Sequence, residues 1–206
     1  MKIIAPSATI EEFTYDAVRR IELVGRTCYK SEDNICEGSA DKFCRMIRDR
    51  GHLAMFDHAY ASVRFIVDRG VSHEIVRHRI GVGYAQESTR YCNYSKGKFG
   101  EECTFIKPCF WEEGSPLFNE WKDVMLEVER VYLNMLQDGA SPQEARSVLP
   151  NSLKTELVAT GTFTYWRHFF KQRVPTAAHP QMREVTRPLL EEFIGLWPAI
   201  FDDLTV

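Results

Sequence analysis

Hydrophobic and polar residues alternate regularly between residues 59 and 68, which indicates an extended strand with one buried face. The side expected to face the core carries Ala61, Val63, Phe65 and Val67. Shorter apolar runs predict three further strands, over residues 3–5, 104–107 and 154–159.

Hydrophobic positions three and four residues apart predict helices in much of the remaining chain. The longest is expected to begin after Ser115, a capping residue followed by Pro116 at the first helical position, and to end at Gly139. Further helices are predicted over residues 14–27, 39–51, 71–79, 141–146, 165–173 and 180–193. Ser39 is expected to cap the second of these and Ser72 to open the third. This mixture predicts an α+β fold, with a twisted central sheet wrapped by helices.

Length and composition are those of an ordinary globular protein. The chain has 206 residues, of which 44% are hydrophobic and 27% charged, so we expect one domain over residues 1–206. A net charge of −3 gives no general attraction to nucleic acid polymers or anionic membranes, and no apolar run approaches the roughly 20 residues of a membrane span. The six cysteines have irregular spacing and no C-x-x-C pair, which predicts reduced thiols in a cytoplasmic protein.

A short segment, residues 77–91, concentrates the polar chemistry of the chain. It holds three arginines, a histidine, a glutamine and a glutamate, with two glycines between them. Guanidinium groups beside glycine-exposed backbone N–H groups can bind a phosphate. A solvated charged turn is the alternative, because clustered charges usually face water. Since the whole chain is slightly acidic, the segment suits a small anionic ligand better than a nucleic acid.

Within this segment, eight residues separate Arg77-His78-Arg79 from Ser88, and Arg90-Tyr91 follow. This pattern resembles the signature of the flavin-dependent thymidylate synthases, the ThyX family, in which the gap is seven residues. The additional residue is most simply a glycine within residues 81–83. Three further blocks match the family in the right order, at residues 56–74, 145–150 and 160–173, so the resemblance runs from roughly Gly51 to Glu192.

The resemblance implies a ThyX-like fold and the reductive methylation of dUMP to dTMP. FAD would be the cofactor, methylenetetrahydrofolate the one-carbon donor and NADPH the reductant of the flavin. It also implies a homotetramer whose flavin and nucleotide sites lie between subunits. An alternative enzyme is a flavin-dependent hydroxymethylase acting on a uridylate. A non-catalytic nucleotide-binding or RNA-binding module is a third hypothesis, which the net charge of −3 disfavours.

By match to the family pattern, Arg173 is the expected catalytic residue, together with Ser88. A fixed guanidinium near the uracil would stabilise negative charge at N3 and O4 without itself titrating. The expected dUMP contacts are Glu74, Arg77, Gln86, Glu87, Ser88, Arg90, Arg146 and Arg173, with Ser88 and Arg90 on the phosphate. The expected FAD contacts are His58, Arg77, His78, Arg79, Gln86, Thr162 and His168.

Several positions differ from residues that are frequent in the family. They are Asp57 for Glu, Glu74 for Gln, Gln86 for Glu, and Thr162 and His168 for Asn. An acid in place of an amide replaces a donor with a negative charge, which repels phosphate unless a cation pairs with it. These departures leave room for a relative that transfers a hydroxymethyl group.

Two motifs resemble other chemistry without matching it. His73 and His78 are five residues apart, whereas a zinc-binding helix needs two histidines four apart, so no metal site is expected. Pro108-Cys109-Phe110 is similar to the Pro-Cys-His nucleophile of the folate-only thymidylate synthases, but the histidine is missing. Nothing around Cys109 supplies the basic surroundings that lower a thiol pKa.

Overall fold

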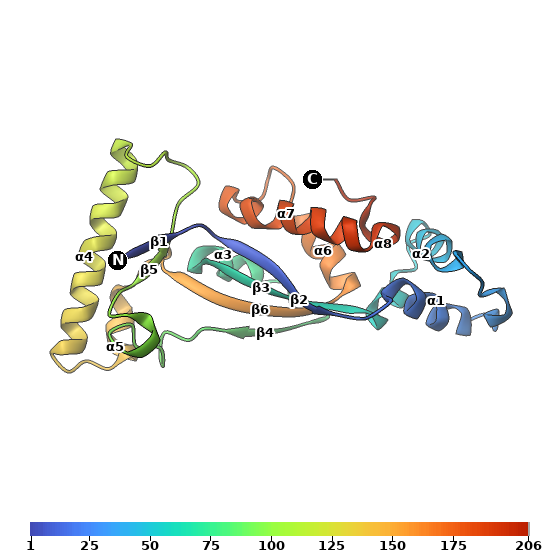
Figure 1. Ribbon diagram of the computed structural model, residues 1–206, viewed down its shortest axis with the longest axis horizontal. Coiled ribbons are helices and arrows are strands. Elements are labelled where there is room, and N and C mark those ends of the chain that lie inside the picture. The colour runs from blue at the N-terminus through green and yellow to red at the C-terminus, as the bar shows by residue number, and fades with distance from the viewer. Residues whose placement is uncertain (206) are drawn as a thin grey trace. The chain divides into compact units, whose positions relative to one another are not determined.

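The computed structural model describes residues 1–205, except for the side chain of residue 98. Four strands form its larger sheet. In spatial order the strands are β2 (Ser7–Phe13), β3 (Tyr60–Asp68), β6 (Lys154–Thr162) and β4 (Val82–Gln86) (Figure 1). A second pair joins β1 (Lys2–Ile4) to β5 (Thr104–Ile106) in parallel, with Ile3 opposite Phe105. Together with the helices, these sheets confirm the predicted mixture of α and β structure.

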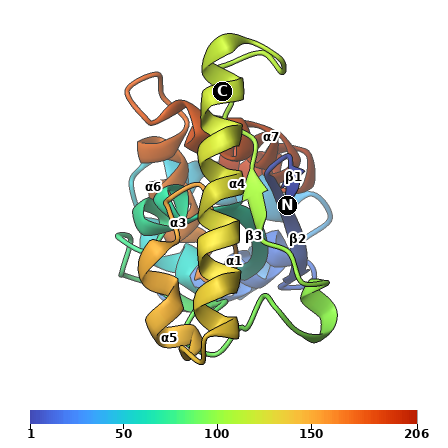
Figure 2. The ribbon, with the colours of Figure 1, turned by 90° about the vertical axis from the view of Figure 1, so that its left-hand side faces the viewer.

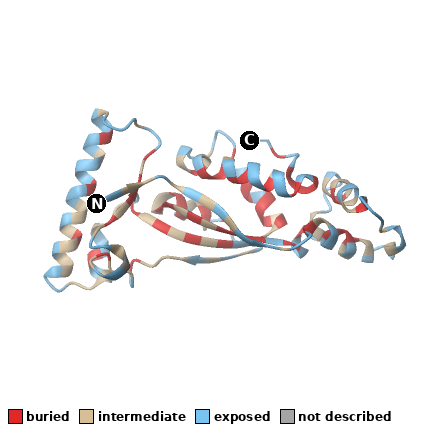
Figure 3. Ribbon diagram, viewed as in Figure 1, coloured by how far each residue is buried: buried red, intermediate tan, exposed pale blue. Residues whose placement is uncertain are grey.

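The central strands bury alternate residues, as the period of two predicts. On β3, Ala61, Val63 and Phe65 are fully buried and Val67 is 1% exposed. Figure 3 shows the same alternation along β6, where buried and partly exposed positions follow each other. One face of these strands therefore packs in the interior, and the predicted strand at residues 59–68 is confirmed.

The chain divides into two compact units. Unit 1 consists of Met1–Ser7, Phe65–Val76 and Ala85–Leu157. Unit 2 consists of Ala8–Arg64, Arg77–Tyr84 and the chain from Val158 onward. The expected single domain over residues 1–206 stays a prediction, and residue 206 lies outside the described residues.

Unit 1 contains the longest helix, α4 (Pro116–Gln137), which lies beside α5 (Pro142–Ala145) in Figure 2. Helix α4 also contacts η4 (Arg146–Val148). The Ser115 hydroxyl caps α4 by accepting a bond from the Phe118 N–H, as predicted. Ser141 and Glu144 form the predicted capping box of α5. The unit also holds α3 (Arg69–Ile75) and η3 (Gly97–Phe99). Its core contains Tyr94, Cys103, Phe105, Met125, Tyr132, Ala145 and Leu153.

Unit 2 contains the remaining helices. They are α1 (Ala17–Thr27), η1 (Glu32–Asn34), α2 (Ser39–Asp49), η2 (Leu53–His58), α6 (Phe163–Arg173), α7 (Pro180–Leu196) and α8 (Pro198–Phe201). Aromatic rings fill the core between α6, α7 and α8. Phe163 lies 4.7 Å from Trp197, and Phe193 lies 5.3 Å from Trp166, measured between ring centroids. Such edge-on and tilted pairs each add about 0.5–1.5 kcal/mol to the burial of the rings, so α6 is firmly anchored.

Two predicted helix caps, Ser39 and Ser72, are wrong. Gly38, in a left-handed conformation, precedes α2 in place of the expected cap Ser39, whose hydroxyl bonds the buried Glu22 instead. Asp68 caps α3 by accepting a bond from the Val71 N–H, and Ser72 donates back to the carbonyl of Arg69.

One helix end and two strands also differ from expectation. Helix α3 ends at Ile75, so Arg77–Arg79 lie beyond it rather than in its last turn. Residues 82–86, for which no strand was predicted, form the edge strand β4. Strand β2 was not predicted, because only Ala8 and Ile10 alternate with polar residues before Glu11 and Glu12 follow each other, so the apolar pattern is short. No helix among residues 1–205 is long and apolar enough to cross a membrane.

Candidate functional site

A pocket of about 920 Å³ opens in unit 2 between η2, residues 77–81 and helix α6. All its lining residues belong to this unit. Six residues that the sequence singled out line it together: Arg77, His78, Arg79, Thr162, His168 and Arg173. His58, at the exposed end of η2, is not among the lining residues, whereas its neighbour Asp57 is. The structure thus gathers most of the expected flavin contacts in one place.

The centre of this pocket is a hydrogen bond between Arg173 and His78. The Arg173 Nε–H donates to His78 Nε2 over 2.9 Å. His78 is 8% exposed, and its burial, the charge of Arg173 and the neighbouring His168 lower its pKa to about 4. The imidazole is therefore neutral near pH 7, with its proton on Nδ1, because Nε2 accepts the bond. The guanidinium of Arg173 is therefore held at Nε by a neutral acceptor.

Two tyrosines hold His78 from behind. The Tyr84 hydroxyl donates to the backbone carbonyl of His78 over 2.7 Å, and it lies 3.0 Å from the hydroxyl of Tyr165. Burial raises the pKa of both phenols, so both stay protonated. The ring of Phe169 contacts the imidazole edge-on at 5.1 Å between centroids. Backbone, ring and Nε2 of His78 are each fixed, so the position of Arg173 is defined.

The start of α6 is hydrogen-bonded to η2 and to residues 81–83, which we call the glycine segment. Thr162 caps the helix by accepting a bond from the Tyr165 N–H, and its hydroxyl donates to Asp57 over 2.8 Å. Its N–H donates to the Gly81 carbonyl over 2.9 Å. Gly81 has a φ of +74°, and a Cβ built there would lie 2.9 Å from the Thr162 oxygen. Position 81 therefore requires glycine, whereas a Cβ at Gly83 would meet nothing within 4 Å.

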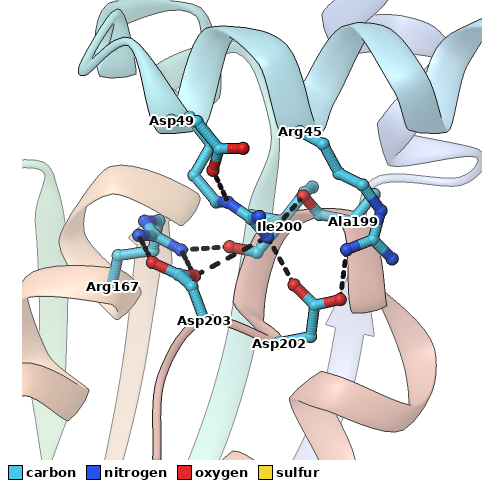
Figure 4. Close-up of polar contacts among 8 residues, drawn as sticks. Arg45, Asp49, Arg167, Ala199, Ile200, Asp202 and Asp203 are labelled. Atoms are coloured by element: carbon cyan, nitrogen blue, oxygen red, sulfur yellow. Dashed lines mark hydrogen bonds and ion pairs between the residues drawn. The ribbon is translucent and has the colours of Figure 1, made fainter.

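The pocket is strongly cationic. Arg77, Arg79 and Lys171 are exposed at its walls and add to the charge of Arg173. Arg167 also lines it, but Asp203 neutralises this arginine through two hydrogen bonds of 2.7 and 2.6 Å (Figure 4). Sequence reasoning missed Lys171, although it lies three residues after His168 on the same helix and therefore shares its face.

The expected nucleotide contacts fall mainly in unit 1, where Gln86 is engaged internally. Its Nε2 donates to the hydroxyls of Ser72 over 2.9 Å and of Thr155 over 3.2 Å. Both hydroxyl residues are fully buried. Gln86 therefore satisfies two interior polar groups and fixes the end of β4.

Glu87 follows with two partners of its own. Its carboxylate accepts from the Tyr94 hydroxyl over 2.9 Å and from Lys154 Nζ over 2.8 Å. The side chain is 10% exposed, and its N–H donates to the carbonyl of Glu156. The negative charge is thus compensated locally by Lys154, and the residue anchors the segment that follows.

Ser88, Arg90 and Arg146 are available at the surface of unit 1. The Ser88 hydroxyl accepts from the N–H of Arg90 over 3.3 Å, and Arg90 is exposed above the ring of Tyr91 at 5.5 Å. Arg146, on η4, donates to the Thr89 hydroxyl over 3.4 Å. Residues 88–90 and Arg146 thus place two guanidinium groups in one region, while Glu74 is half-buried on α3.

Comparison with known proteins gives a consistent family. The family profile described as thymidylate synthase complementing protein matches residues 9–199, which run through both units. A flavin-dependent thymidylate synthase from Pyrococcus furiosus is 31% identical over 186 residues, covering 89% of this chain and 73% of that protein. One from Mycobacterium tuberculosis is 27% identical over 198 residues, covering 90% and 79%.

A solved structure has the same fold. The crystal structure of the UMP/dUMP methylase PolB from Streptomyces cacaoi, bound with 5-Br dUMP, superposes with a TM-score of 0.81. It covers 98% of this chain and 96% of its own at 18% identity, so this likeness concerns the fold alone. The family profile and the relatives together establish that the chain belongs to the flavin-dependent thymidylate synthase family.

Proposed function

We propose that this protein is a flavin-dependent thymidylate synthase that reductively methylates dUMP to dTMP. FAD is the cofactor, methylenetetrahydrofolate the one-carbon donor and NADPH the reductant. Family membership supports the overall reaction. The single structural observation that carries the proposal is Arg173, fixed on a neutral His78 in a pocket lined by further cations.

The residues of this pocket fit a flavin dinucleotide. Its pyrophosphate needs cations, which Arg77, Arg79 and Lys171 supply, and its ring system needs apolar walls such as Ile80 and Tyr165. The volume of about 920 Å³ lies within the range of small-molecule sites, about 300–1,000 Å³. When bound, the flavin supplies the hydride that completes the methyl group.

Arg173 has the properties needed to activate the pyrimidine. Uracil C5 becomes nucleophilic when negative charge develops at N3 and O4, and a guanidinium stabilises this charge without titrating. Its Nε is already bonded to His78, so the plane of the group is set before substrate binds. Preorganised charge of this kind avoids reorganisation during the reaction.

The phosphate of dUMP is assigned to the exposed groups of unit 1. Ser88, Arg90 and Arg146 provide a hydroxyl and two guanidinium forks, which match phosphate geometry. Gln86 and Glu87 are assigned to holding this segment, because Gln86 Nε2 donates to Ser72 and Thr155 and the Glu87 carboxylate accepts from Tyr94 and Lys154. A catalytic role for Ser88 and substrate contact by Glu74 stay predictions. So do a homotetramer with sites between subunits and a cytoplasmic location.

The deciding experiment is mass spectrometry of the nucleotide formed from dUMP with FAD, NADPH and methylenetetrahydrofolate. A product heavier by one methyl group, formed only with FAD, supports the proposal. A hydroxymethyl product identifies the alternative hydroxymethylase, and unchanged dUMP with bound flavin contradicts both. Arg90→Ala checks the assignment of the phosphate, because it should weaken dUMP binding and leave flavin binding unchanged.

A further inference from the structure

A second pocket, of about 780 Å³, lies in unit 2 and shares no lining residue with the first. Helix η2 contributes to both pockets with different residues. Leu53 and Asp57 line the first, whereas Ala54 and Met55 line the second. The remaining walls of the second pocket come from the end of α1, from α2 and from residues 50–52. We call it the α1–α2 pocket.

The α1–α2 pocket combines an apolar floor with a cationic rim. Phe43, Met46, Ile47 and Met55 contribute apolar side chains to its lining. Its lining has three cationic residues, Arg26, Lys42 and Arg50, of which Arg26 is paired with Glu22, and no aspartate or glutamate is among its lining residues. Lys42 and Arg50 are exposed and form no ion pair within residues 1–205. Such a site favours a ligand with a ring and a negative charge.

One of these cations is built into the fold. Glu22 is 1% exposed, and its Oε1 accepts bonds from Arg26 Nε over 2.8 Å and Nη2 over 2.7 Å. Its Oε2 accepts from the Ser39 hydroxyl over 2.8 Å. A buried carboxylate with three donors is a stable anchor, so Arg26 is held in one orientation at the pocket wall.

The floor is equally defined. The Arg26 guanidinium lies 5.0 Å above the centre of the Phe43 ring, within cation–π range. A Cβ at Gly25 would lie 2.5 Å from that ring, so only glycine lets Phe43 occupy this position. The packing of α1 against α2 therefore leaves an aromatic surface beside the anchored Arg26 and the exposed Lys42 and Arg50.

We propose that the α1–α2 pocket binds the benzoyl-glutamate end of the folate one-carbon donor. This inference rests on the proposed function, from which the donor class comes. The benzoyl ring packs on Phe43 and Met46, and the glutamate carboxylates pair with Lys42 and Arg50 at the rim. Because η2 lines both pockets, the donor's acidic end binds on one side of this helix and the flavin pocket lies on the other.

The first test measures binding without turnover. The probe is p-aminobenzoyl-L-glutamate, which has the ring and both carboxylates but no pterin, titrated calorimetrically into the FAD-loaded protein. Lys42→Glu and Arg50→Gln should each weaken its binding by about tenfold, as expected for a lost charge-assisted contact. Lys122→Glu, the same charge change at an exposed position of α4, should leave binding unchanged. Equal affinity in all three variants overturns the proposal.

The second test uses steady-state kinetics. Lys42→Glu should raise the KM for methylenetetrahydrofolate about tenfold, with the KM for dUMP and the kcat near those of the unchanged protein. A matching loss of FAD affinity in Lys42→Glu would assign the pocket to the flavin and contradict the proposal. If no dTMP forms but Lys42→Glu still weakens the probe, the pocket binds an aromatic dicarboxylate and the proposed function fails instead.

Discussion

Arg167 and Asp203 form a two-bonded ion pair that ties the C-terminal segment to helix α6. Arg167 is 3% exposed, and its two terminal nitrogens reach both carboxylate oxygens of Asp203 (Figure 4). The same guanidinium donates to the carbonyl of Ile200, and Asp202 bonds Arg45 and Arg48 on α2. The last residues of the chain thus connect α2, α6 and α8 within unit 2.

Asp203→Asn should therefore destabilise the protein. The change removes the negative charge and leaves a buried guanidinium without its counter-ion, which we expect to cost about 1–2 kcal/mol because Asp203 is partly exposed. Urea unfolding measures this difference. Asp123→Asn, at an exposed position of α4, is the matched control and should leave the midpoint unchanged. Equal midpoints for the two variants would show that the pair contributes nothing.

The same pair predicts an acid-sensitive contribution to stability. Burial opposes ionisation of Asp203, but hydrogen bonds and the charge of Arg167 outweigh it, so its pKa lies below the usual 3.8. A carboxyl group whose pKa is lowered by folding stabilises the folded state fully at pH values above its pKa in the unfolded chain. This contribution is lost as the pH falls through its pKa in the folded chain. The stability difference between the unchanged protein and Asp203→Asn should be constant above about pH 5 and should shrink below about pH 4. A difference that does not change with pH would contradict this assignment.

His78 predicts a pH dependence at less acidic values. Its pKa is lowered from 6.5 to about 4 in the folded chain, so the unfolded chain binds more protons between these values. The stability that neutral His78 confers is complete above pH 6.5 and is lost as pH falls toward 4. His78→Gln, which cannot titrate, should show a shallower fall in the free energy of unfolding across this interval. Parallel pH profiles would contradict a neutral His78.

Substitution of His78 should also affect the reaction. His78→Ala removes the acceptor for Arg173 Nε, and loss of this orientation should lower kcat by roughly 100-fold. His78→Gln can still present an oxygen to Arg173 and should recover part of the rate. Flavin content, measured by absorbance, separates a loss of orientation from a loss of cofactor. Equal rates for His78→Ala and His78→Gln would remove the hydrogen bond from the account.

Tyr84→Phe should also affect His78, through its backbone carbonyl. It deletes the bond to the His78 carbonyl while keeping the ring, at a cost of about 1 kcal/mol in stability. Tyr165→Phe loses only the contact between the two hydroxyls and should have the smaller effect on kcat. Thermal unfolding and kcat, measured on both variants, give the comparison. A larger effect of Tyr165→Phe than of Tyr84→Phe would contradict the prediction that the bond to the His78 carbonyl matters more.

The glycine segment offers a paired test. Gly81→Ala places a Cβ at a φ of +74° and 2.9 Å from the Thr162 oxygen, which should cost about 1–3 kcal/mol and weaken flavin binding. Gly83→Ala meets no atom within 4 Å and should change both quantities little. Thermal unfolding and flavin titration measure the two effects. Similar results for the two variants would mean that the turn at position 81 is adaptable.

Much of the local structure could be predicted because it depends on neighbouring residues. The caps of α4 and α5, the alternation on β3 and the aromatic helix α6 each follow from a pattern within a few positions. Strand β2 was missed because its alternation is short, with only Ala8 and Ile10 as apolar members before two consecutive glutamates. Ser39 was misassigned because its partner, Glu22, lies 17 residues away in the sequence.

The sequence by itself determined the family, through the Arg77-His78-Arg79 to Arg90 segment and the blocks around it, and with the family the expected chemistry. Only the tertiary structure decided which hydrogen-bond partners those residues have. Arg173 and His78 are 95 residues apart, and Gln86 and Thr155 are 69 apart, so neither contact leaves a signal in local spacing. The physical reason is that a cap or a strand is fixed by short-range hydrogen bonds, whereas the pKa of a buried imidazole and the partners of a buried carboxylate depend on which distant side chains the fold brings beside them.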